Sequence, residues 1–196
     1  MTRHCDGEER MGMGSSALIV IDMLNPYDHE DADELAGHVE DIVDPLRRLI
    51  ERARESDTEL VYVNDNYGDF AASRDQLVER ALSGRHPELV EPLAPSDGCD
   101  LLQKVRHSAF YSTSLEYLLR QREVTEVILT GQVTEQCVLY SALDAYVRHY
   151  SVCVPSDAVA PIEPELGDAA LEMMRRNMRA EIVTSDDLLQ RMPARA

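Results

Sequence analysis

Short apolar runs that alternate with helix-length amphipathic segments are the feature that most restricts the fold of this 196-residue chain. The clearest run is ALIVID at residues 17–22, a pattern typical of a strand buried on both faces of a parallel sheet. Residues 35–56 follow it with apolar side chains at helical spacing. Strands that alternate with helices need right-handed crossovers, so the sheet should be parallel and covered on both sides.

The same alternation continues to the end of the chain. We expect six strands, at residues 17–22, 59–64, 100–105, 126–131, 151–155 and 181–185. We expect helices at residues 35–56, 73–82, 113–121, 135–149 and 164–177, with an irregular, proline-rich loop near residues 87–95. The sequence therefore predicts a single doubly wound, Rossmann-like α/β domain at residues 16–196. Its six-stranded parallel sheet would be flanked by helices and preceded by a flexible leader at residues 1–15.

Composition restricts the partners of the chain. It carries 37 acidic and 19 basic residues, a formal net charge of -18, which disfavours nucleic acid and anionic membranes as partners. No apolar run approaches the roughly 20 residues of a membrane span, and the first residues lack the apolar region of a signal peptide. A cytoplasmic protein is expected.

The four cysteines of the chain form no Cys-x-x-Cys pair, so reduced thiols are expected rather than disulfides or a zinc knuckle.

Lys104 is the only lysine in the chain, and the other 18 basic residues are arginine. Lysine is a compact point charge whose pKa shifts readily on burial, whereas arginine is a planar fork. Lys104 closes the third expected strand, Asp22 closes the first, and Cys137 begins the helix after the fourth. Because ligands of an open parallel sheet bind beyond the carboxyl ends of its strands, we expect these three residues to lie together.

The segment before Cys137 indicates a reactive thiol. Gly131 permits a tight turn, and Thr134 is a natural N-cap for the helix that follows. The helix dipole and the ammonium group of Lys104 should then lower the pKa of Cys137 below about 8.5. Asp22 would balance the ammonium group and move a proton. The alternative is structural: a small core cysteine beside a buried Asp22–Lys104 ion pair.

Three runs carry a resemblance to a known family. IDMLN at residues 21–25, KVRHSAFYST at 104–113 and TGQVTEQCV at 130–138 resemble the isochorismatase-like cysteine hydrolases, whose members include nicotinamidases and N-carbamoylsarcosine amidases. The resemblance implies a catalytic triad of Asp22, Lys104 and Cys137. It also implies a cis peptide between Gln132 and Val133, and an oxyanion hole made by the backbone N–H groups of Val133 and Cys137.

The same resemblance bears on metals and on the pocket. Nicotinamidases of this family carry an Asp-x-His metal motif after the second strand, where this chain reads NDNY at residues 64–67. We therefore expect no metal and no cofactor, and nicotinamide is disfavoured as a substrate. The candidate substrate-pocket residues are Asn25, Tyr27, Asn66, Phe110 and Tyr111.

The function that these features favour is hydrolysis of a C–N bond in a small amide, imide or carbamoyl compound through a cysteinyl acyl-enzyme. One alternative is an isochorismatase-type vinyl-ether hydrolase, which needs the aspartate as an acid but no nucleophilic cysteine. The other is a non-catalytic paralogue that binds a metabolite. The expected partners are a small-molecule substrate and further copies of the chain. The resemblance implies a homo-oligomer, because members of this family commonly assemble, and the apolar faces of the helices at residues 137–149 and 164–178 would contribute to the contact.

Overall fold

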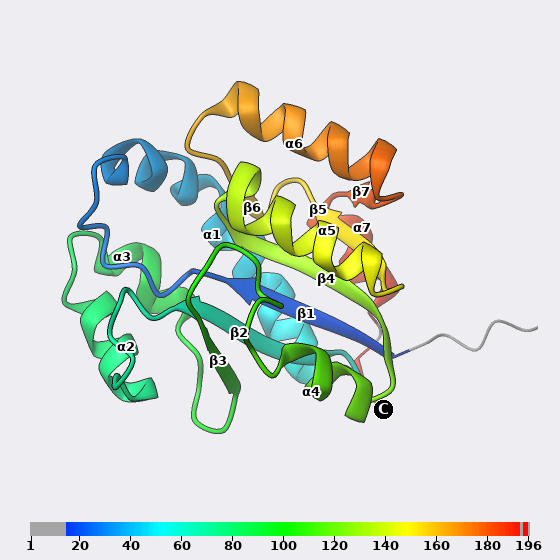
Figure 1. Cartoon of the computed structure of the whole chain (residues 1–196), viewed down its shortest axis with the longest axis horizontal. Helices are drawn as coiled ribbons and strands as arrows, with labels where there is room; N and C mark the ends of the chain where they lie inside the picture. The colour runs from blue at the N-terminus through cyan, green and yellow to red at the C-terminus, as the bar shows by residue number, and fades with distance from the viewer. Residues whose placement is uncertain (1–14, 193, 196) are drawn as a thin grey trace, which may run out of the picture.

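A parallel sheet crosses the middle of the molecule, with helices on both of its faces (Figure 1). The computed structural model describes residues 15–192, 194 and 195. The predicted leader at residues 1–15 lies outside this range except for Ser15, which begins the first strand. The doubly wound α/β fold expected from the sequence is confirmed.

The sheet contains every strand that the sequence predicts and one short addition. Its order is β3-β2-β1-β4-β5-β7, with β6 paired to β4, and all the pairs are parallel. The strands are β1 (Ser15–Ile21), β2 (Glu59–Asp65), β3 (Asp100–Lys104), β4 (Val124–Gln132), β5 (Ser151–Pro155), β6 (Val159–Ala160) and β7 (Glu181–Val183). The unexpected strand, β6, is two residues long, which is too short to leave a periodic pattern in the sequence.

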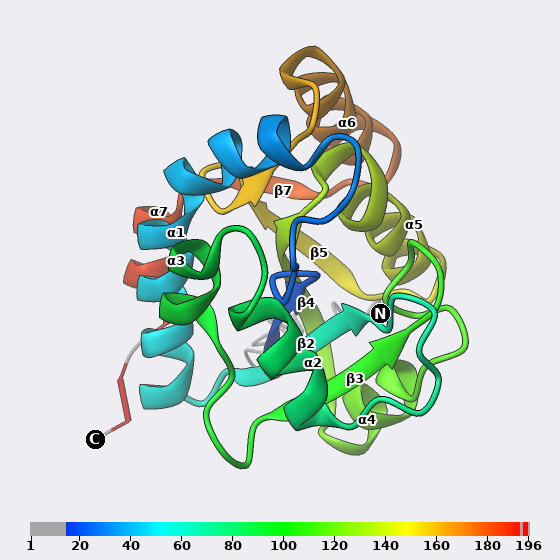
Figure 2. The same ribbon diagram turned by 90° about the vertical axis from the view of Figure 1, so that its left-hand side faces the viewer.

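The helices form one layer on each face of the sheet (Figures 1 and 2). Side chains of α1 (Ala32–Glu55), α3 (Pro87–Val90) and α7 (Ser185–Arg191) enter one apolar core, and those of α4 (Leu115–Gln121), α5 (Leu139–Val147) and α6 (Pro164–Asn177) enter the other. The helix α2 (Arg74–Leu82) follows β2 and adds Leu77 and Ala81 to the first core, and a short 3-10 helix, Glu91–Leu93, follows α3. Neither α3 nor α7 was expected, although a capping box between Thr184 and Asp187 marks the start of α7.

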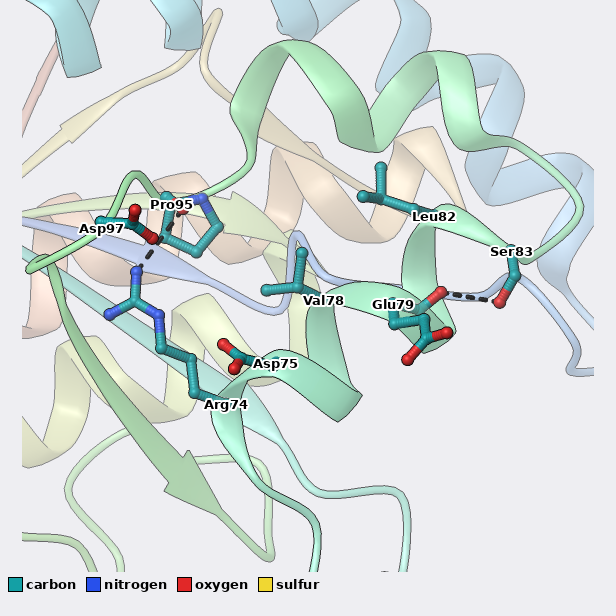
Figure 3. Close-up of a pocket in the computed structure, with 8 residues that line it drawn as sticks. All are labelled: Arg74, Asp75, Val78, Glu79, Leu82, Ser83, Pro95 and Asp97. Atoms are coloured by element: carbon teal, nitrogen blue, oxygen red, sulfur yellow. Dashed lines mark hydrogen bonds between the residues drawn. The ribbon is translucent and has the colours of Figure 1, made fainter.

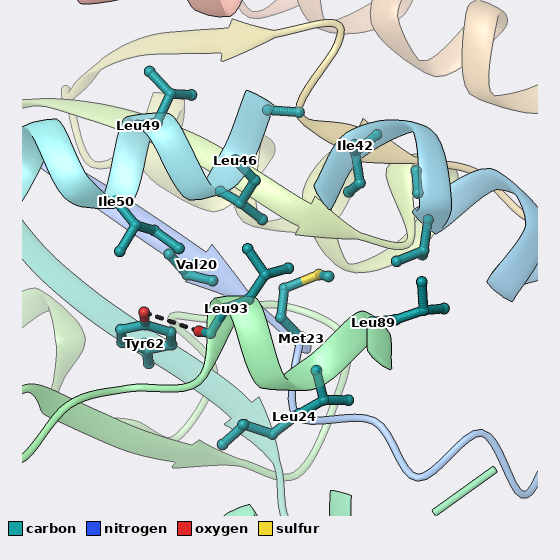
Figure 4. Packing of buried hydrophobic residues seen from close by; sticks show 14 of the residues in the cluster. Val20, Met23, Leu24, Ile42, Leu46, Leu49, Ile50, Tyr62, Leu89 and Leu93 are labelled. Atoms are coloured by element: carbon teal, nitrogen blue, oxygen red, sulfur yellow. Dashed lines mark hydrogen bonds between the residues drawn. The ribbon is translucent and has the colours of Figure 1, made fainter. Parts of the chain in front are cut away.

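The core beneath α1 shows why its sequence forms a helix. Leu46, Leu49 and Ile50 recur at helical spacing and are buried against β1 and β2, as Figure 4 shows. Tyr62 of β2 lies in the same core, where its hydroxyl donates a hydrogen bond to the carbonyl oxygen of Leu93 at 3.1 Å. The polar end of this buried ring is therefore satisfied.

Gly131 allows the ends of the two central strands to approach each other. It pairs with Ile21 in the parallel register and has a φ of +102°. A Cβ atom at this position would lie 2.1 Å from the carbonyl oxygen of Ile21. Only glycine fits here, and this close approach sets the residues that follow β4 against those that follow β1.

We predict that Gly131→Ala lowers the free energy of unfolding by about 2–4 kcal/mol, because the added methyl group meets rigid backbone at a positive φ. The measurement is the midpoint of urea unfolding followed by circular dichroism. Gly37→Ala is the matched control, since nothing lies within 4 Å of the added atom and the site is in α1. That control should be as stable as the parent or up to about 1 kcal/mol more stable. Parent-like stability of Gly131→Ala would contradict the close approach.

Candidate functional site

The strand order reverses between β1 and β4, and the candidate site lies beyond the carboxyl ends of these strands. Asp22 follows the last residue of β1, and Lys104 is the last residue of β3. Cys137 lies in a π-helical turn, Thr134–Val138, that joins β4 to α5. The topology therefore brings to one edge of the sheet three residues that are far apart in the sequence.

Lys104 makes contacts with the other two. Its Nζ atom lies 2.8 Å from Oδ2 of Asp22 and 3.5 Å from Sγ of Cys137. Nζ also lies 3.6 Å from Oδ2 of Asp65, the last residue of β2. The exposed fractions of Lys104, Asp22 and Cys137 are 1%, 7% and 8%. The lysine is thus a buried cation between two carboxylates and a thiol.

Backbone hydrogen bonds hold Asp22 in place. Its φ is +53°, and its N–H donates to the carbonyl oxygen of Val63 at 3.0 Å. Oδ1 of Asp22 accepts a hydrogen bond from the N–H of Asp65 at 2.7 Å. The side-chain amide of Gln132 donates to the Asp22 carbonyl oxygen at 2.6 Å. The backbone and the carboxylate of Asp22 are therefore positioned by the ends of β4 and β2, respectively.

The turn that carries Cys137 is tied to the segment after β3. The Gln132–Val133 peptide is cis, and the N–H of Val133 faces the Cys137 sulfur. The hydroxyl of Ser141 donates to the Cys137 carbonyl oxygen at 2.6 Å and accepts from the N–H of Ala109 at 2.9 Å. These bonds fix the turn against the loop that follows Lys104.

Two expectations about this turn are wrong. Thr134 does not cap the helix, because the turn begins after Val133, and the Thr134 hydroxyl is buried without a partner among the described residues. Burial raises the pKa of the Cys137 thiol, and the negative charge of Asp22 raises it further, against the opposing effect of Lys104. The thiol pKa is therefore raised rather than lowered, because the sequence does not reveal how deeply the sulfur is buried.

The pKa values of the two neighbours also depend on burial. Burial raises the pKa of Asp22, although the ammonium group of Lys104 opposes the shift. For Lys104, burial acts to lower the pKa, but the charges of Asp22 and Cys137 outweigh it, so the pKa is raised. Lys104 therefore remains a cation at neutral pH.

Two residues of the cluster were not expected from the sequence. Asp65 contacts Lys104, as described above, and directly follows the predicted second strand. His107 places Nδ1 3.8 Å from the Cys137 sulfur and stacks on the ring of Tyr140. Its place three residues after Lys104 was the available signal, because that position lies close to the end of β3.

A cavity of about 240 Å³ opens onto this cluster. Its polar lining consists of Asp22, Asn25, His29, Asp31, Asp65, Gln132, Gln136 and Cys137. Leu35, Val133 and Ile162 give it a small apolar wall. A cavity of this size and composition suits a small polar molecule.

Of the five pocket residues suggested by the sequence, Asn25 lines the cavity and the other four do not. Tyr27 is buried, and its hydroxyl donates to Gln132 Oε1 at 3.4 Å. Asn66 is buried and accepts a hydrogen bond from the N–H of Gly68. Phe110 packs against Tyr150 in the core, and Tyr111 is exposed. Position near a strand end did not reveal which way these side chains point.

A second hollow, of about 480 Å³, lies on the surface beside α2 (Figure 3). Arg74 lines it and donates hydrogen bonds to the carbonyl oxygens of Pro95, Ser96 and Cys99. The lining holds no cysteine, and the cluster around Lys104 does not contribute to it. We therefore take the smaller cavity beside Cys137 as the candidate site.

Residues 15–192, 194 and 195 contain no group of three or more histidine, cysteine, aspartate or glutamate side chains placed to hold a metal ion. In the same residues, none of the helices combines the length and apolar character needed to cross a membrane.

Curated proteins similar to this chain include enzymes and proteins of unassigned activity. An uncharacterized isochorismatase family protein, YaaI of Bacillus subtilis, is 34% identical over 92% of this chain and 100% of its own length. The maleamate amidohydrolase of Pseudomonas putida is 28% identical over 94% of this chain and 90% of its own. A probable inactive nicotinamidase of Arabidopsis thaliana is 29% identical over 82% and 88%.

Solved structures give the same relationship. An isochorismatase-like hydrolase from Alkaliphilus metalliredigens has a TM-score of 0.74 and 29% identity, covering 90% of this chain and 98% of its own. The N-carbamoylsarcosine amidase of Thermoplasma acidophilum has a TM-score of 0.67 and 33% identity, covering 88% and 97%. The family model of the isochorismatase domain matches residues 16–187. With its parallel sheet and the cluster at the edge of that sheet, this chain belongs to the isochorismatase family.

Proposed function

We propose that this protein hydrolyses a C–N bond in a small amide, imide or carbamoyl compound, with Cys137 as the nucleophile. The observation that carries the proposal is the position of the Lys104 ammonium group, buried between the Asp22 carboxylate and the Cys137 thiol beside a cavity. Similarity to a maleamate amidohydrolase and to an N-carbamoylsarcosine amidase supports C–N hydrolysis as the reaction class.

The charges of the cluster suggest how the thiol reacts. Lys104 supplies one positive charge, while burial raises the pKa of both Asp22 and Cys137. Of Asp22 and Cys137, such a site favours one as an anion at a time, and the titration belongs to the pair. We infer that the resting enzyme holds Asp22 as the carboxylate and Cys137 as the thiol. The raised pKa of Asp22 makes it a better proton acceptor.

In the proposed first half of the reaction, the sulfur attacks the substrate carbonyl carbon while the thiol proton passes to Asp22. The carbonyl oxygen becomes an oxyanion, which accepts hydrogen bonds from the N–H groups of Val133 and Cys137. Each such donor contributes about 3 kcal/mol in known cases. The C–N bond then breaks, the nitrogen takes the proton from Asp22, and a thioester remains on Cys137.

In the second half, Asp22 takes a proton from water as the water oxygen adds to the thioester carbonyl carbon. The C–S bond breaks, and the sulfur recovers the proton from Asp22. The products are an acid and an amine or ammonia, and the enzyme returns to its starting state. Lys104 keeps its proton throughout and stabilises whichever neighbour is the anion.

Two alternatives remain as competing proposals. A vinyl-ether hydrolase would use Asp22 as an acid and would need no thiol beside it, so the contact between Lys104 and Cys137 favours the amidohydrolase. A non-catalytic binding protein is the alternative suggested by the relative named as inactive. The intact Asp22, Lys104 and Cys137 cluster favours an enzyme.

We also propose that the protein forms a homo-oligomer. Tyr140, Leu143, Tyr146 and Val147 give α5 an exposed apolar surface, and Leu143 and Val147 are 45% and 55% exposed. A contiguous apolar surface on a helix is typical of a protein–protein contact.

We predict ammonia or amine release from at least one member of a panel of small amides, ureides and carbamoyl compounds. Cys137→Ala should lose at least about 1,000-fold in turnover, because the acyl group then has no sulfur to accept it. Cys99→Ala is the matched control and should keep parental turnover, since Cys99 lies outside the cavity. If Cys137→Ala retains activity, the covalent route is excluded.

A second prediction concerns the effect of the Asp22 charge on the ionisation of the Cys137 thiol. Asp22→Asn should shift the alkylation of Cys137 by iodoacetamide to lower pH, because the Asp22 charge raises the thiol pKa. Turnover should fall by at least about 100-fold in the same variant, because the proton acceptor is lost. The measurement is peptide mass spectrometry of alkylation against pH. Asp65→Asn is the control, and its shift should be smaller. Alkylation at higher pH in Asp22→Asn would contradict the account.

The oligomer proposal has its own test. The double variant Leu143→Glu, Val147→Glu should sediment as a smaller species than the parent in sedimentation velocity, because two carboxylates oppose burial of α5. A parent that already sediments as a monomer would refute self-association. Met173 is exposed on α6, so Met173→Glu tests whether that helix contributes to the contact between copies.

A further inference from the structure

We propose that the cavity selects its substrate by charge: it favours amides with a cationic group over neutral ones and disfavours amides with a carboxylate. The residue that distinguishes these groups is Asp31. The inference rests on the proposed function, because it names the substrate class of the same site. It is carried by the charged groups around the cavity and by the unusual situation of Asp31.

The charged groups of the cavity are mostly acidic. Asp22, Asp31 and Asp65 line it, and no arginine or lysine side chain does so in the part of the chain that the structure describes. Lys104 contacts two of these lining residues, but its ammonium group already lies between Asp22 and Asp65. A substrate carboxylate would therefore enter without a lysine or arginine side chain to pair with it.

His29 also lines the cavity, where it contacts Asn25. Oδ1 of Asn25 accepts a hydrogen bond from the N–H of Tyr27 at 2.8 Å, which fixes the orientation of the Asn25 amide. Its Nδ2 group then faces Nε2 of His29 at 3.4 Å. The group that contacts this ring is therefore a neutral amide rather than one of the cavity carboxylates.

Asp31 differs from the aspartates on either side of it. Asp28 pairs with Arg80 at 3.3 Å, and Asp33 pairs with Arg85. The Asp31 side chain takes part in no ion pair or hydrogen bond with the described residues. It also does not cap α1, although it occupies the N-cap position. Arg80 and Arg85 are therefore already paired with Asp28 and Asp33. Of these three aspartates, Asp31 lines the cavity.

This arrangement predicts which groups bind. Asp31 and Cys137 line the same cavity, so one substrate can present an ammonium group to Asp31 and its carbonyl carbon to the Cys137 sulfur. A carboxylate at the same place would face Asp31 and Asp65, and like charges held together repel. Because Asp31 is exposed, salt should weaken the selection.

The test uses three amides that share a propanamide unit and differ at the far carbon: 3-aminopropanamide (ammonium), butanamide (methyl) and succinamate (carboxylate). At low ionic strength, the parent should show the highest kcat/KM for the ammonium compound and the lowest for the carboxylate, with at least a tenfold span. Added salt should narrow this span. Equal kcat/KM values or a preference for succinamate would overturn the inference.

Asp31→Asn is the decisive variant, and Asp28→Asn is its matched control with the same change in net charge. The ratio of kcat/KM for 3-aminopropanamide to that for succinamate should fall at least fivefold in Asp31→Asn. It should stay within about twofold of the parent in Asp28→Asn, because screening limits the reach of an exposed charge outside the cavity. Equal changes in the two variants would show that only net charge matters and would overturn the role of Asp31.

Binding separates this inference from the proposed function. Calorimetric titration of the Cys137→Ala protein with the same three amides should give the same order of affinity, whether or not the parent hydrolyses them. If the parent hydrolyses none of the panel amides while the order of affinity holds, the proposed function fails and the charge selection stands. If succinamate is hydrolysed best through Cys137, the proposed function stands and the charge selection fails. Absence of binding by all three amides would overturn the charge selection.

Discussion

The ammonium group of Lys104 is buried, and the protein must therefore neutralise it internally. Asp22 and Asp65 do so, at 2.8 and 3.6 Å from Nζ. Removing either partner of such a buried pair leaves an uncompensated charge, which is costly. The thiol of Cys137 lies against the same ammonium group, so its ionisation depends on what its neighbours carry. A planar guanidinium group cannot replace this compact charge between three close neighbours. This explains why position 104 holds a lysine in a chain whose other basic residues are arginine.

The sheet makes this cluster possible. Asp22, Asp65 and Lys104 stand at or directly after the ends of β1, β2 and β3, and Cys137 follows β4. Parallel strands place all these ends at one edge, and Gly131 lets β4 approach β1 closely enough to complete the group. The fold thus supplies the positions, while the side chains supply the charge balance on which the proposed chemistry depends.

The sequence predicts six of the strands, their parallel direction and the meeting of Asp22, Lys104 and Cys137, because these follow from local periodicity and from the geometry of parallel sheets. It does not predict the lining of the cavity. Tyr27 and Phe110 turn into the core, and His29 and Asp31, which line the cavity, were not among the expected pocket residues. The direction of the Cys137 pKa shift was also missed, since burial arises from tertiary packing rather than from the turn itself.

The central claim is that the Cys137 sulfur carries the acyl group during hydrolysis. The most direct measurement is mass spectrometry of enzyme that is quenched with acid while it turns over a substrate amide. The account predicts a mass increase equal to the acyl group, located on the peptide that contains Cys137 and lost on treatment with hydroxylamine. Steady product release with no adduct on that peptide in a rapidly quenched single turnover, or an adduct on another residue, would contradict it.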